Sequence, residues 1–217
     1  MGGILEVFQR PDFLFQLLVH VELSVVALLI GVAIALPVAL AFYRFPLAST
    51  VAVKIGNIGR AVPSLAILAL VFPLLGFGFD AALVGLVLLA IPPILINAST
   101  ALRQVDPQVV DAARGMGLSG GQILGRIQIP IALPVIFAGI RTSAVQVVAS
   151  ATLATFIGGG GLGDLIVLGF QRNDLAVQIG GSLAVAALAI ITEVSFGSLE
   201  RTYTPKGLLI ARERPNK

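Results

Sequence analysis

Long apolar runs separated by shorter polar connections dominate this chain. A bilayer core about 30 Å thick needs about 20 apolar residues for each helix that crosses it. The apolar positions are continuous and do not alternate with polar ones, so they predict helices and not the strands of a membrane barrel. The pattern predicts an all-α integral membrane protein with about five transmembrane helices, in a single domain over residues 1–217. The five predicted runs are residues 14–41, 60–77, 80–98, 131–156 and 177–197.

The composition supports a membrane location. With 57% hydrophobic and 12% charged residues among 217, a soluble globule of this size has too little interior to hide the apolar surface. Residues 1–12 carry only Arg10 as a basic residue. Because the first run is long enough to span a bilayer, we expect it to act as its own insertion signal and not as a cleaved peptide. The chain contains no cysteine, which excludes disulfides and thiolate metal sites.

Basic residues are distributed unequally between the two sides of the predicted membrane. Eleven lie after the first and third runs or in the C-terminal tail, whereas Arg10 and Arg172 lie on the other side and Arg141 falls inside the fourth run. The positive-inside rule then predicts that the N-terminus is outside and the C-terminus is cytoplasmic. The basic residues lack interleaved aromatics, so they indicate topology and not nucleic-acid binding. The eleven are Arg44, Lys54, Arg60, Arg103, Arg114, Arg126, Arg201, Lys206, Arg212, Arg214 and Lys217.

The predicted cytoplasmic loop 103–130 contains a polar stretch punctuated by glycines, DAARGMGLSGGQILGRIQIP. We expect a short helix to begin near Pro107, with acidic residues in its first turn, and a second to cover about residues 122–128. The glycines between them allow a sharp turn, and Pro130 can open the next membrane helix. Two short helices joined in this way form a knob that fits a cleft of a partner protein. An ordinary amphipathic loop at the headgroups is the alternative.

The order of residues in this stretch resembles the coupling loop of ABC importer permeases, which reads Glu-Ala-Ala, three residues, Gly, nine residues, Ile-x-Leu-Pro. Asp111 replaces the Glu and Ile129 replaces the Leu, and both keep the chemical type. The phrases VPSLAILAL, LPVIFAGIRT and ATFIGGGGLGD extend the likeness over about residues 15–200. Together they resemble the permeases of osmoprotectant importers, which carry glycine betaine, choline or carnitine. The matched coupling positions are Asp111, Ala112, Ala113, Gly117, Ile127, Ile129 and Pro130.

This resemblance implies a function and a set of partners. In the family, two permease subunits form the pore, as identical copies or as a paralogous pair, in the bacterial inner (cytoplasmic) membrane. Two ATPase subunits bind ATP and Mg and dock on the coupling loops, and an extracytoplasmic solute-binding protein delivers the solute. ATP binding turns the pore from inward-facing to outward-facing. The chain would then be a multi-pass permease with no catalytic, cofactor or metal site of its own. Methionine importer permeases are similar at the coupling loop and at GGGGLGD, so an amino-acid importer is the alternative.

A stripe of polar residues in the fourth run is the candidate translocation path. Its members fall within an arc of about 100° on one helix face. Such a stripe either lines a wet cavity or bonds to a neighbouring helix, and the sequence leaves both open. Arg141 and Glu193 are interpreted as residues that snorkel to the interface, since nothing in the sequence supports a pair between them. Thr155 is expected to bond to its own helix. The stripe consists of Thr142, Ser143, Gln146 and Ser150.

The segment 158–176 is rich in glycine and lies on the predicted outer side. Its spacing fits G-x-G-x-x-G, but a dinucleotide site needs a preceding strand, and no Lys-Ser or Lys-Thr completes a phosphate loop, so we expect no ATP binding by this chain. The same segment spells the G-x-G-D of intramembrane aspartyl proteases at Asp164. That chemistry needs two carboxylates within the membrane, whereas Asp80, at the very start of the run 80–98, and Asp111 are interpreted as loop residues. The family likeness implies an external gate instead, with candidates Gly158, Gly160, Gly161 and Gly163.

Other classes of membrane protein lack support. The only histidine is His20, and neither an HExxH motif nor a Ser-His pair within the core is evident, so zinc and serine membrane proteases have even less support than an aspartyl protease. His20 and Glu22 are interpreted as interfacial residues at the outer start of the first run. A channel or secondary transporter would show inverted repeats or charged relays, and neither is apparent.

Overall fold

The computed structural model describes residues 3–203, and this range is helical, without a strand. Four helices are long and apolar enough to cross a membrane, and a bent pair of helices makes a fifth span if it is counted as one. The prediction of an all-α membrane protein with about five spans is confirmed. The predicted cytoplasmic residues Lys206, Arg212, Arg214 and Lys217 lie outside the described residues.

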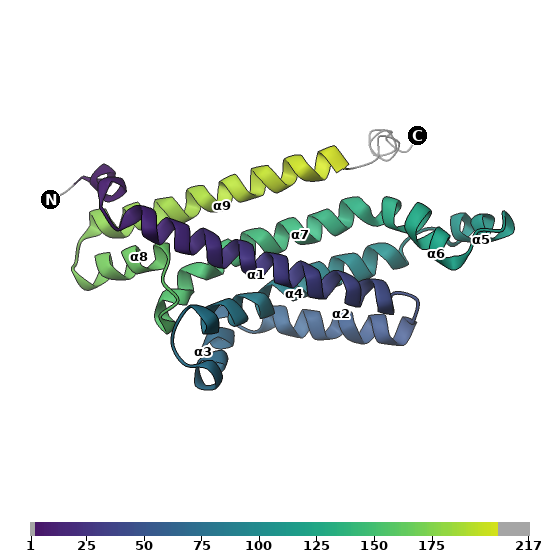
Figure 1. Cartoon of the computed structure of the whole chain (residues 1–217), viewed down its shortest axis with the longest axis horizontal. Coiled ribbons are helices and arrows are strands. Elements are labelled where there is room, and N and C mark those ends of the chain that lie inside the picture. The colour runs from purple at the N-terminus through teal and green to yellow at the C-terminus, as the bar shows by residue number, and fades with distance from the viewer. Residues whose placement is uncertain (1–2, 204–217) are drawn as a thin grey trace.

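Four long helices form the body of the molecule: α1 (Phe13–Phe42), α4 (Phe79–Arg103), α7 (Ile129–Ala151) and α9 (Leu175–Tyr203). Helix α4 packs against both α1 and α7, and α9 packs against α7 (Figure 1). The shorter elements are η1 (Ile4–Gln9), α2 (Pro46–Ala61), α3 (Ser64–Leu75), α5 (Pro107–Gly115), α6 (Gly120–Ile123), η2 (Leu124–Gln128), η3 (Thr152–Ile157) and α8 (Leu162–Gln171).

Small residues bring the long helices close together. A Cβ added at Gly31 of α1 would lie 2.7 Å from the Cβ of Ala90 in α4, and one at Gly139 of α7 would lie 3.1 Å from the Pro93 carbonyl oxygen. In a bilayer the lipid is as apolar as the helix surface, so helices associate through close packing of this kind. The centre of α4 is therefore held between α1 and α7.

The predicted run 60–77 is not one straight helix. It begins in the last turn of α2, breaks at Val62 and Pro63, and continues as α3, with a bend of 96° between the two helices. Proline disfavours the helical conformation of the residue before it, and Val62 is extended with ψ of 127°. Helix α2 packs along α4, and α3 turns away from that direction (Figure 1).

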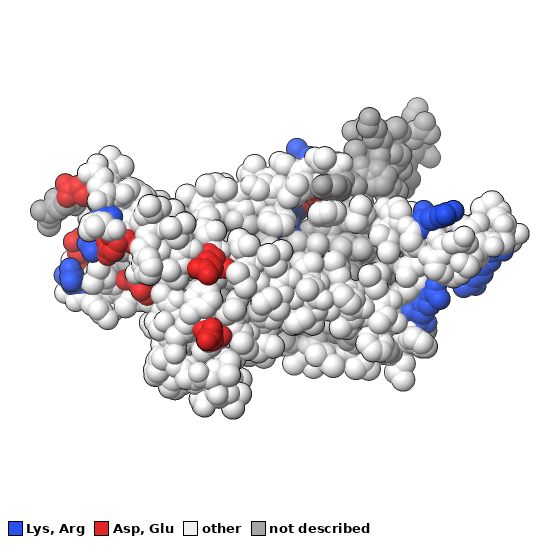
Figure 2. Space-filling model, viewed as in Figure 1, with Lys and Arg blue, Asp and Glu red and all other residues white. Residues whose placement is uncertain are grey.

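The two ends of the bundle differ in charge. Helices α5 and α6 project at one end, and α8 and η1 lie at the other (Figure 1). On the face shown in Figure 2, Lys and Arg side chains gather around the α5–α6 end, whereas the Asp and Glu side chains lie towards the opposite end, together with some Lys or Arg. The orientation of the bundle in a membrane stays a prediction.

Candidate functional site

The α5–α6 projection begins with a well-defined cap. The Asp106 carboxylate accepts a hydrogen bond from the Gln108 amide at 2.8 Å, and Pro107 occupies the first turn. The prediction that a helix begins near Pro107 is confirmed, although its first turn holds no acidic residue. The acid lies one step earlier, at Asp106, where an Asp cap satisfies an amide that the helix leaves free. The sequence reasoning missed this cap.

The turn that follows α5 depends on a single glycine. Gly117 has φ of 82°, its amide donates to the Arg114 carbonyl at 2.9 Å, and the Leu118 amide donates to the Ala113 carbonyl at 3.2 Å. These bonds close the end of α5 through a left-handed residue, a conformation that a Cβ would strain. The position of Gly117 in the coupling pattern therefore has a local structural reason.

The second part of the projection is not a separate short helix, as the prediction for residues 122–128 had it. Ser119 and Gln122 form a reciprocal cap, with bonds of 2.8 Å and 3.4 Å. From there α6, the π-helical turn η2, α7 and η3 form one helical segment, Gly120–Ile157. A π-helical turn lets a helix continue where the regular hydrogen-bond pattern is interrupted, and here it ends two positions before Pro130, which lacks an amide donor. The residues from α6 onward are thus helically continuous with α7, whereas the Gly117 turn separates α5 from them.

The matched coupling positions fall into two groups. Asp111, Ala112 and Gly117 are exposed on the α5 projection, and Asp111 pairs with Arg114 at 3.3 Å, with the two side chains 69% and 68% exposed. Ala113 is fully buried, so it packs the projection and does not present a surface. The second group lies at the root of the projection, where all three residues are partly buried: Ile127, Ile129 and Pro130.

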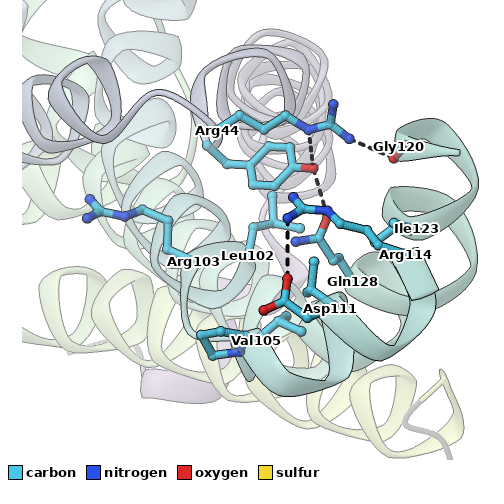
Figure 3. Close-up of a pocket in the computed structure, with 12 residues that line it drawn as sticks. Arg44, Leu102, Arg103, Val105, Asp111, Arg114, Gly120, Ile123 and Gln128 are labelled. Carbon is cyan, nitrogen blue, oxygen red and sulfur yellow. Dashed lines mark hydrogen bonds and ion pairs between the residues drawn. The ribbon is translucent and has the colours of Figure 1, made fainter. Parts of the chain in front are cut away.

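A chain of hydrogen bonds ties the projection to the end of α1 (Figure 3). Arg44 donates to the Gly120 carbonyl at 2.6 Å and to the Tyr43 hydroxyl at 2.7 Å. That hydroxyl donates in turn to Oε1 of Gln128 at 2.8 Å, and both Tyr43 and Gln128 are buried. These residues line a cleft of about 420 Å³ between α1, α4 and the projection. Arg44 appeared in the sequence only as a topological charge.

The polar stripe on α7 is divided between two roles. Ser143 is fully buried and donates to the Ala90 carbonyl of α4 at 2.8 Å, so its hydroxyl serves helix packing. Thr142 is exposed and donates to the Ala138 carbonyl of its own helix at 2.9 Å. Gln146 is half-buried and Ser150 is buried. A role of this stripe in translocation stays a prediction.

The glycine-rich segment at the opposite end of α7 forms a compact turn. Gly158, Gly160 and Gly161 have φ of 74°, 74° and 96°, a region that favours glycine. Gly163 differs, because it lies inside α8 and a Cβ there would stand 2.1 Å from the Thr152 carbonyl oxygen. Of the four gate candidates, three therefore serve the backbone conformation of the turn, and Gly163 serves a close contact between helices.

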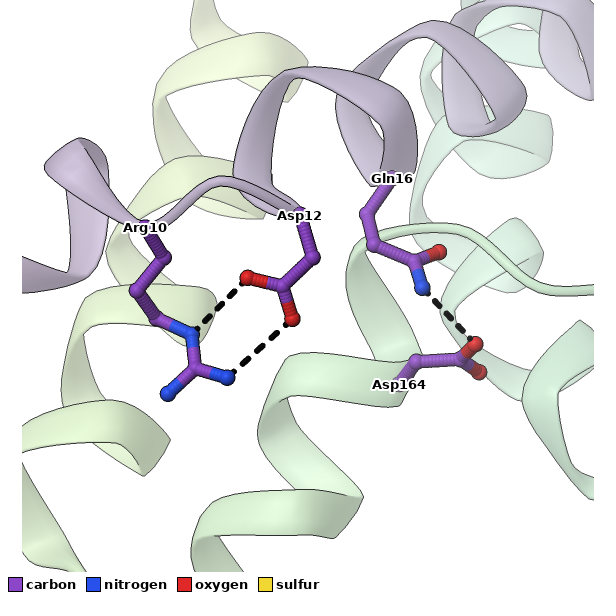
Figure 4. Close-up of polar contacts among 4 residues, drawn as sticks. All are labelled: Arg10, Asp12, Gln16 and Asp164. Atoms are coloured by element: carbon purple, nitrogen blue, oxygen red, sulfur yellow. Dashed lines mark hydrogen bonds and ion pairs between the residues drawn. The ribbon is translucent and has the colours of Figure 1, made fainter.

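Two residues of α1 hold this turn. Oε1 of Gln16 accepts from the Gly161 amide at 2.9 Å, and its amide nitrogen donates to Asp164 at 3.2 Å (Figure 4). One helical turn later, Nδ1 of His20 accepts from the Leu162 amide at 3.3 Å. The start of α8 is therefore bound to α1 by side chains spaced i, i+4.

His20 is fully buried, and its interpretation as an interfacial residue is wrong. Its Nε2 bonds to the Val148 carbonyl of α7 at 2.9 Å, while Nδ1 accepts from Leu162. With one ring nitrogen as donor and the other as acceptor, these bonds fit the neutral imidazole. A Gln and a His spaced i, i+4 on an apolar helix are the signal that could have revealed this contact.

The carboxylate of Asp164 is engaged by neutral partners. It accepts from Gln16 and from the hydroxyl of Thr155, which was expected to bond to its own helix instead. Within residues 3–203, no three His, Cys, Asp or Glu side chains gather as a metal site. Asp164 therefore closes a local hydrogen-bond network around the start of α8.

Charged residues connect α7 with α9. Arg141 forms ion pairs with Glu193 at 3.4 Å and with Glu200 at 3.1 Å. The sequence reasoning had left Arg141 and Glu193 as separate snorkelling residues, and the structure corrects this. Glu193 and Glu200 are seven positions apart along α9, which is about two helical turns, so both lie on the face directed towards α7.

At the N-terminal start of α1, Arg10 donates two hydrogen bonds to the Asp12 carboxylate, at 3.0 Å and 3.1 Å (Figure 4). Hydrogen bonding from Arg10 lowers the pKa of Asp12 below its ordinary value. This pair joins η1 to the first turn of α1, and both side chains remain partly exposed.

Comparison with known protein families matches residues 24–205 to the binding-protein-dependent transport system inner membrane component. The chain belongs to this family. It has the fold of an ABC importer permease, since it superimposes on a chain of the MetNI methionine ABC transporter, solved in inward-facing conformations, with a TM-score of 0.77. That match covers 89% of this chain and 96% of the other at 23% identity. An amino acid ABC transporter with histidines gives a TM-score of 0.67 at 18% identity.

Curated relatives are similar over nearly the whole chain. The carnitine transport permease protein OpuCB of Listeria monocytogenes is 39% identical over 98% of this chain and 99% of its own length. The glycine betaine/carnitine/choline transport system permease protein OpuCB of Bacillus subtilis is 39% identical over 91% of each chain. The family is thus supported by a profile, by sequence and by fold.

Proposed function

We propose that this chain is the pore-forming permease subunit of an ATP-driven importer for a compatible solute such as glycine betaine, choline or carnitine. The observation that carries the solute class is the 39% identity, over 98% of the chain, to a carnitine transport permease. The proposed location is the bacterial inner membrane, with the N-terminus outside and the C-terminus cytoplasmic. A second permease subunit, an ATPase pair and an extracytoplasmic solute-binding protein complete the complex.

The α5–α6 projection is the proposed docking element for the ATPase. It stands at the basic end of the bundle, which the positive-inside rule assigns to the cytoplasm. Asp111, Ala112 and Gly117 form its exposed surface, and small residues there allow a partner to approach closely. ATP and Mg bind in the partner, and this chain supplies the surface that follows the partner's motion.

The proposed coupling route is a single helical segment. Residues 120–157 run from the projection to the glycine turn without a break. A displacement of the projection would therefore move α7 and reach the outer end, where α1 holds the glycine turn through Gln16 and His20. In this mechanism the polar stripe of α7 faces the translocation path at Thr142 and Gln146, while Ser143 secures α7 to α4.

Two alternatives have weaker support. An amino-acid importer rests on structures at 23% and 18% identity, which carry the fold alone. An aspartyl protease would need a second carboxylate beside Asp164, whose partners are an amide and a hydroxyl.

Co-purification followed by uptake tests the proposal. The tagged chain is expressed with its native ATPase and solute-binding protein, reconstituted into liposomes and supplied with ATP inside. We expect uptake of labelled glycine betaine, choline or carnitine that depends on both ATP and the binding protein. Uptake of methionine in place of these solutes would support the amino-acid importer, and purification without any ATPase would overturn the permease proposal.

Paired glycine variants link the assay to the projection. Gly117→Asp places a charged side chain at a left-handed residue on the proposed docking surface. Gly125→Asp is the matched control, since residue 125 is exposed on η2 and a Cβ there meets no described atom within 4 Å. We expect ATPase co-purification and uptake to be lost only in the first variant.

A further inference from the structure

A second cleft, of about 500 Å³, lies between the first half of α2 and the last turns of α4, beside the α5–α6 end. Six of its seven lining residues are polar, two of them are basic, and none is acidic. Donors of this kind suit an anion, because guanidinium, ammonium and hydroxyl groups all bind phosphate oxygens. The polar residues are Ser49, Thr50, Lys54, Thr100, Arg103 and Gln104.

One of these residues, Ser49, has a hydroxyl that a ligand in the cleft could bind. Ser49 is fully buried, and its hydroxyl has no hydrogen-bond partner in the part of the chain that the structure describes. Buried hydroxyls in folded proteins are normally paired, because leaving one unpaired costs free energy. A ligand oxygen in the cleft would supply the missing partner.

The guanidinium of Arg103 is already directed to this cleft. It donates to the Thr50 hydroxyl of α2 at 3.2 Å, and Figure 3 shows it pointing away from Arg44 and Gly120. Nearer the middle of the bundle, Gly56 brings α2 into contact with Ile96 of α4, where a Cβ would lie 2.9 Å from the Ile96 side chain. The cleft therefore occupies the end of the α2–α4 contact that faces the proposed cytoplasmic side.

An apolar stripe runs along the outside of the same helix. Its four side chains are 45% to 79% exposed, and their spacing of four, four and three residues places them on one face of α2. A bilayer would cover such a stripe with acyl chains. The stripe consists of Leu47, Val51, Ile55 and Ile58.

We propose that this cleft binds the phosphate of an anionic phospholipid headgroup, with the acyl chains of the lipid along the apolar stripe. Basic pockets between membrane helices at the cytoplasmic face have the chemistry for such headgroups. Free phosphate offers the same oxygens without the chains, so the stripe is the feature that favours a lipid. The inference requires the chain to lie in a membrane but does not require transport.

Lipid retention tests the site. The full-length chain is placed in nanodiscs with equal amounts of phosphatidylglycerol and phosphatidylcholine, and retained lipid is counted by native mass spectrometry after release. We expect preferential retention of phosphatidylglycerol. Each basic residue near an anionic surface contributes about fivefold in affinity, so the double variant Lys54→Gln, Arg103→Gln should lose about 25-fold of this preference. Ser49→Ala should reduce it a few-fold without lowering the unfolding temperature.

Charge-matched controls separate the cleft from general surface charge. Arg126→Gln removes a charge at the same end of the bundle outside the cleft, and Arg172→Gln removes one at the opposite end. We expect less than a twofold change from either. Equal losses in the controls and in the double variant would overturn the proposal, as would a preference unchanged in both the double variant and Ser49→Ala.

Two further experiments identify which molecule occupies the cleft and covers the apolar stripe. Inorganic phosphate is added as a competitor, and we expect no displacement of lipid at millimolar concentration; full displacement would assign the cleft to free phosphate. Val51→Cys is used to test for a disulfide between two copies of the chain. Efficient cross-linking with loss of retained lipid would show that a second copy covers the stripe, and this would overturn the lipid assignment.

Discussion

The two glycine turns at the ends of residues 120–157 are built in opposite ways. In the orientation proposed above, the turn at residues 158–161 is the outer turn and the turn at Gly117 is the inner turn. At the outer end, Gly158, Gly160 and Gly161 are left-handed and lie against the bundle, where the Gly161 amide is bound by α1. At the inner end, Gly117 is the one left-handed residue of its turn, it is exposed, and a Cβ there meets no described atom within 4 Å. Both turns need glycine for φ, but only the outer one also needs it for space.

This difference indicates what each turn is for. Two amides of the outer turn donate hydrogen bonds to α1, one to partly buried Gln16 and one to buried His20, so the position of this turn is determined by the permease itself. The inner turn is stabilised by local caps and by Arg44, which leaves its surface available to another protein. The helical segment between the turns is therefore held by α1 at one end and exposed at the other, which fits the proposed coupling to a separate ATPase.

The largest expected effect comes from Gly163→Ala. The new Cβ would stand 2.1 Å from the Thr152 carbonyl oxygen, so α8 or η3 has to shift. We expect a loss of about 3 kcal/mol or more, at or beyond the upper end for overpacked sites. Circular dichroism during heating in detergent measures it, since the chain has no Trp to report. Gly115→Ala is the control and should change stability by less than about 1 kcal/mol; similar unfolding temperatures would contradict the comparison.

His20→Ala tests the outer turn from the α1 side. The substitution removes the partner of the Leu162 amide and a contact to Val148, and it leaves a small cavity. We expect a loss of about 2 kcal/mol. Glu22→Ala, two residues away and exposed, should stay within about 0.5 kcal/mol of the parent chain. If the two variants unfold alike, α1 does not hold the turn.

At the inner end, Arg44→Gln should have a smaller and local effect. It removes the bonds to the Gly120 carbonyl and the Tyr43 hydroxyl, worth about 1 kcal/mol at this exposed position. Hydrogen exchange should accelerate in residues 107–123 and stay unchanged in α4 and α7. Arg126→Gln removes the same charge from the exposed face of η2 and should leave the exchange pattern as it was. Acceleration throughout the bundle would show that the projection is not an independent unit.

The sequence predicted the helical class and the start of α5 because apolar run length and the Pro107 signal act locally. The contacts that define the two ends could not be predicted from local sequence. His20 joins residues 128 and 142 positions away in the chain, and Tyr43 joins Gln128 across 85 positions. The break at Val62 could have been predicted from the proline that follows it. The pairing of Arg141 with Glu193 and Glu200 depends on which faces of α7 and α9 meet, and no local pattern specifies that.

The smallest effect on stability, and the most selective, is expected from two Asp–Arg pairs, one exposed on α5 and one partly exposed at the start of α1. Asp12 pairs with Arg10 and Asp111 with Arg114, so Asp12→Asn and Asp111→Asn remove equivalent charges. Either should cost less than about 1 kcal/mol in detergent, since exposed pairs contribute little. Arg10 lowers the pKa of Asp12, so the contribution of that pair is present above the ordinary Asp pKa and disappears as the pH falls through the lowered value. The unfolding-temperature difference between parent and Asp12→Asn should therefore vanish in acid.

ATPase co-purification should distinguish these two variants although their stabilities do not. Asp111 lies on the exposed surface of α5 that we propose as the docking element, whereas Asp12 joins η1 to α1 at the far end of the bundle. We expect Asp111→Asn to reduce the retained ATPase several-fold and Asp12→Asn to leave it unchanged. Equal retention would show that the carboxylate at position 111 serves only its pair with Arg114. Docking would then depend on the shape of the Gly117 turn. In that case Gly117→Ala would be the variant that distinguishes the exposed turn from the turn held by α1.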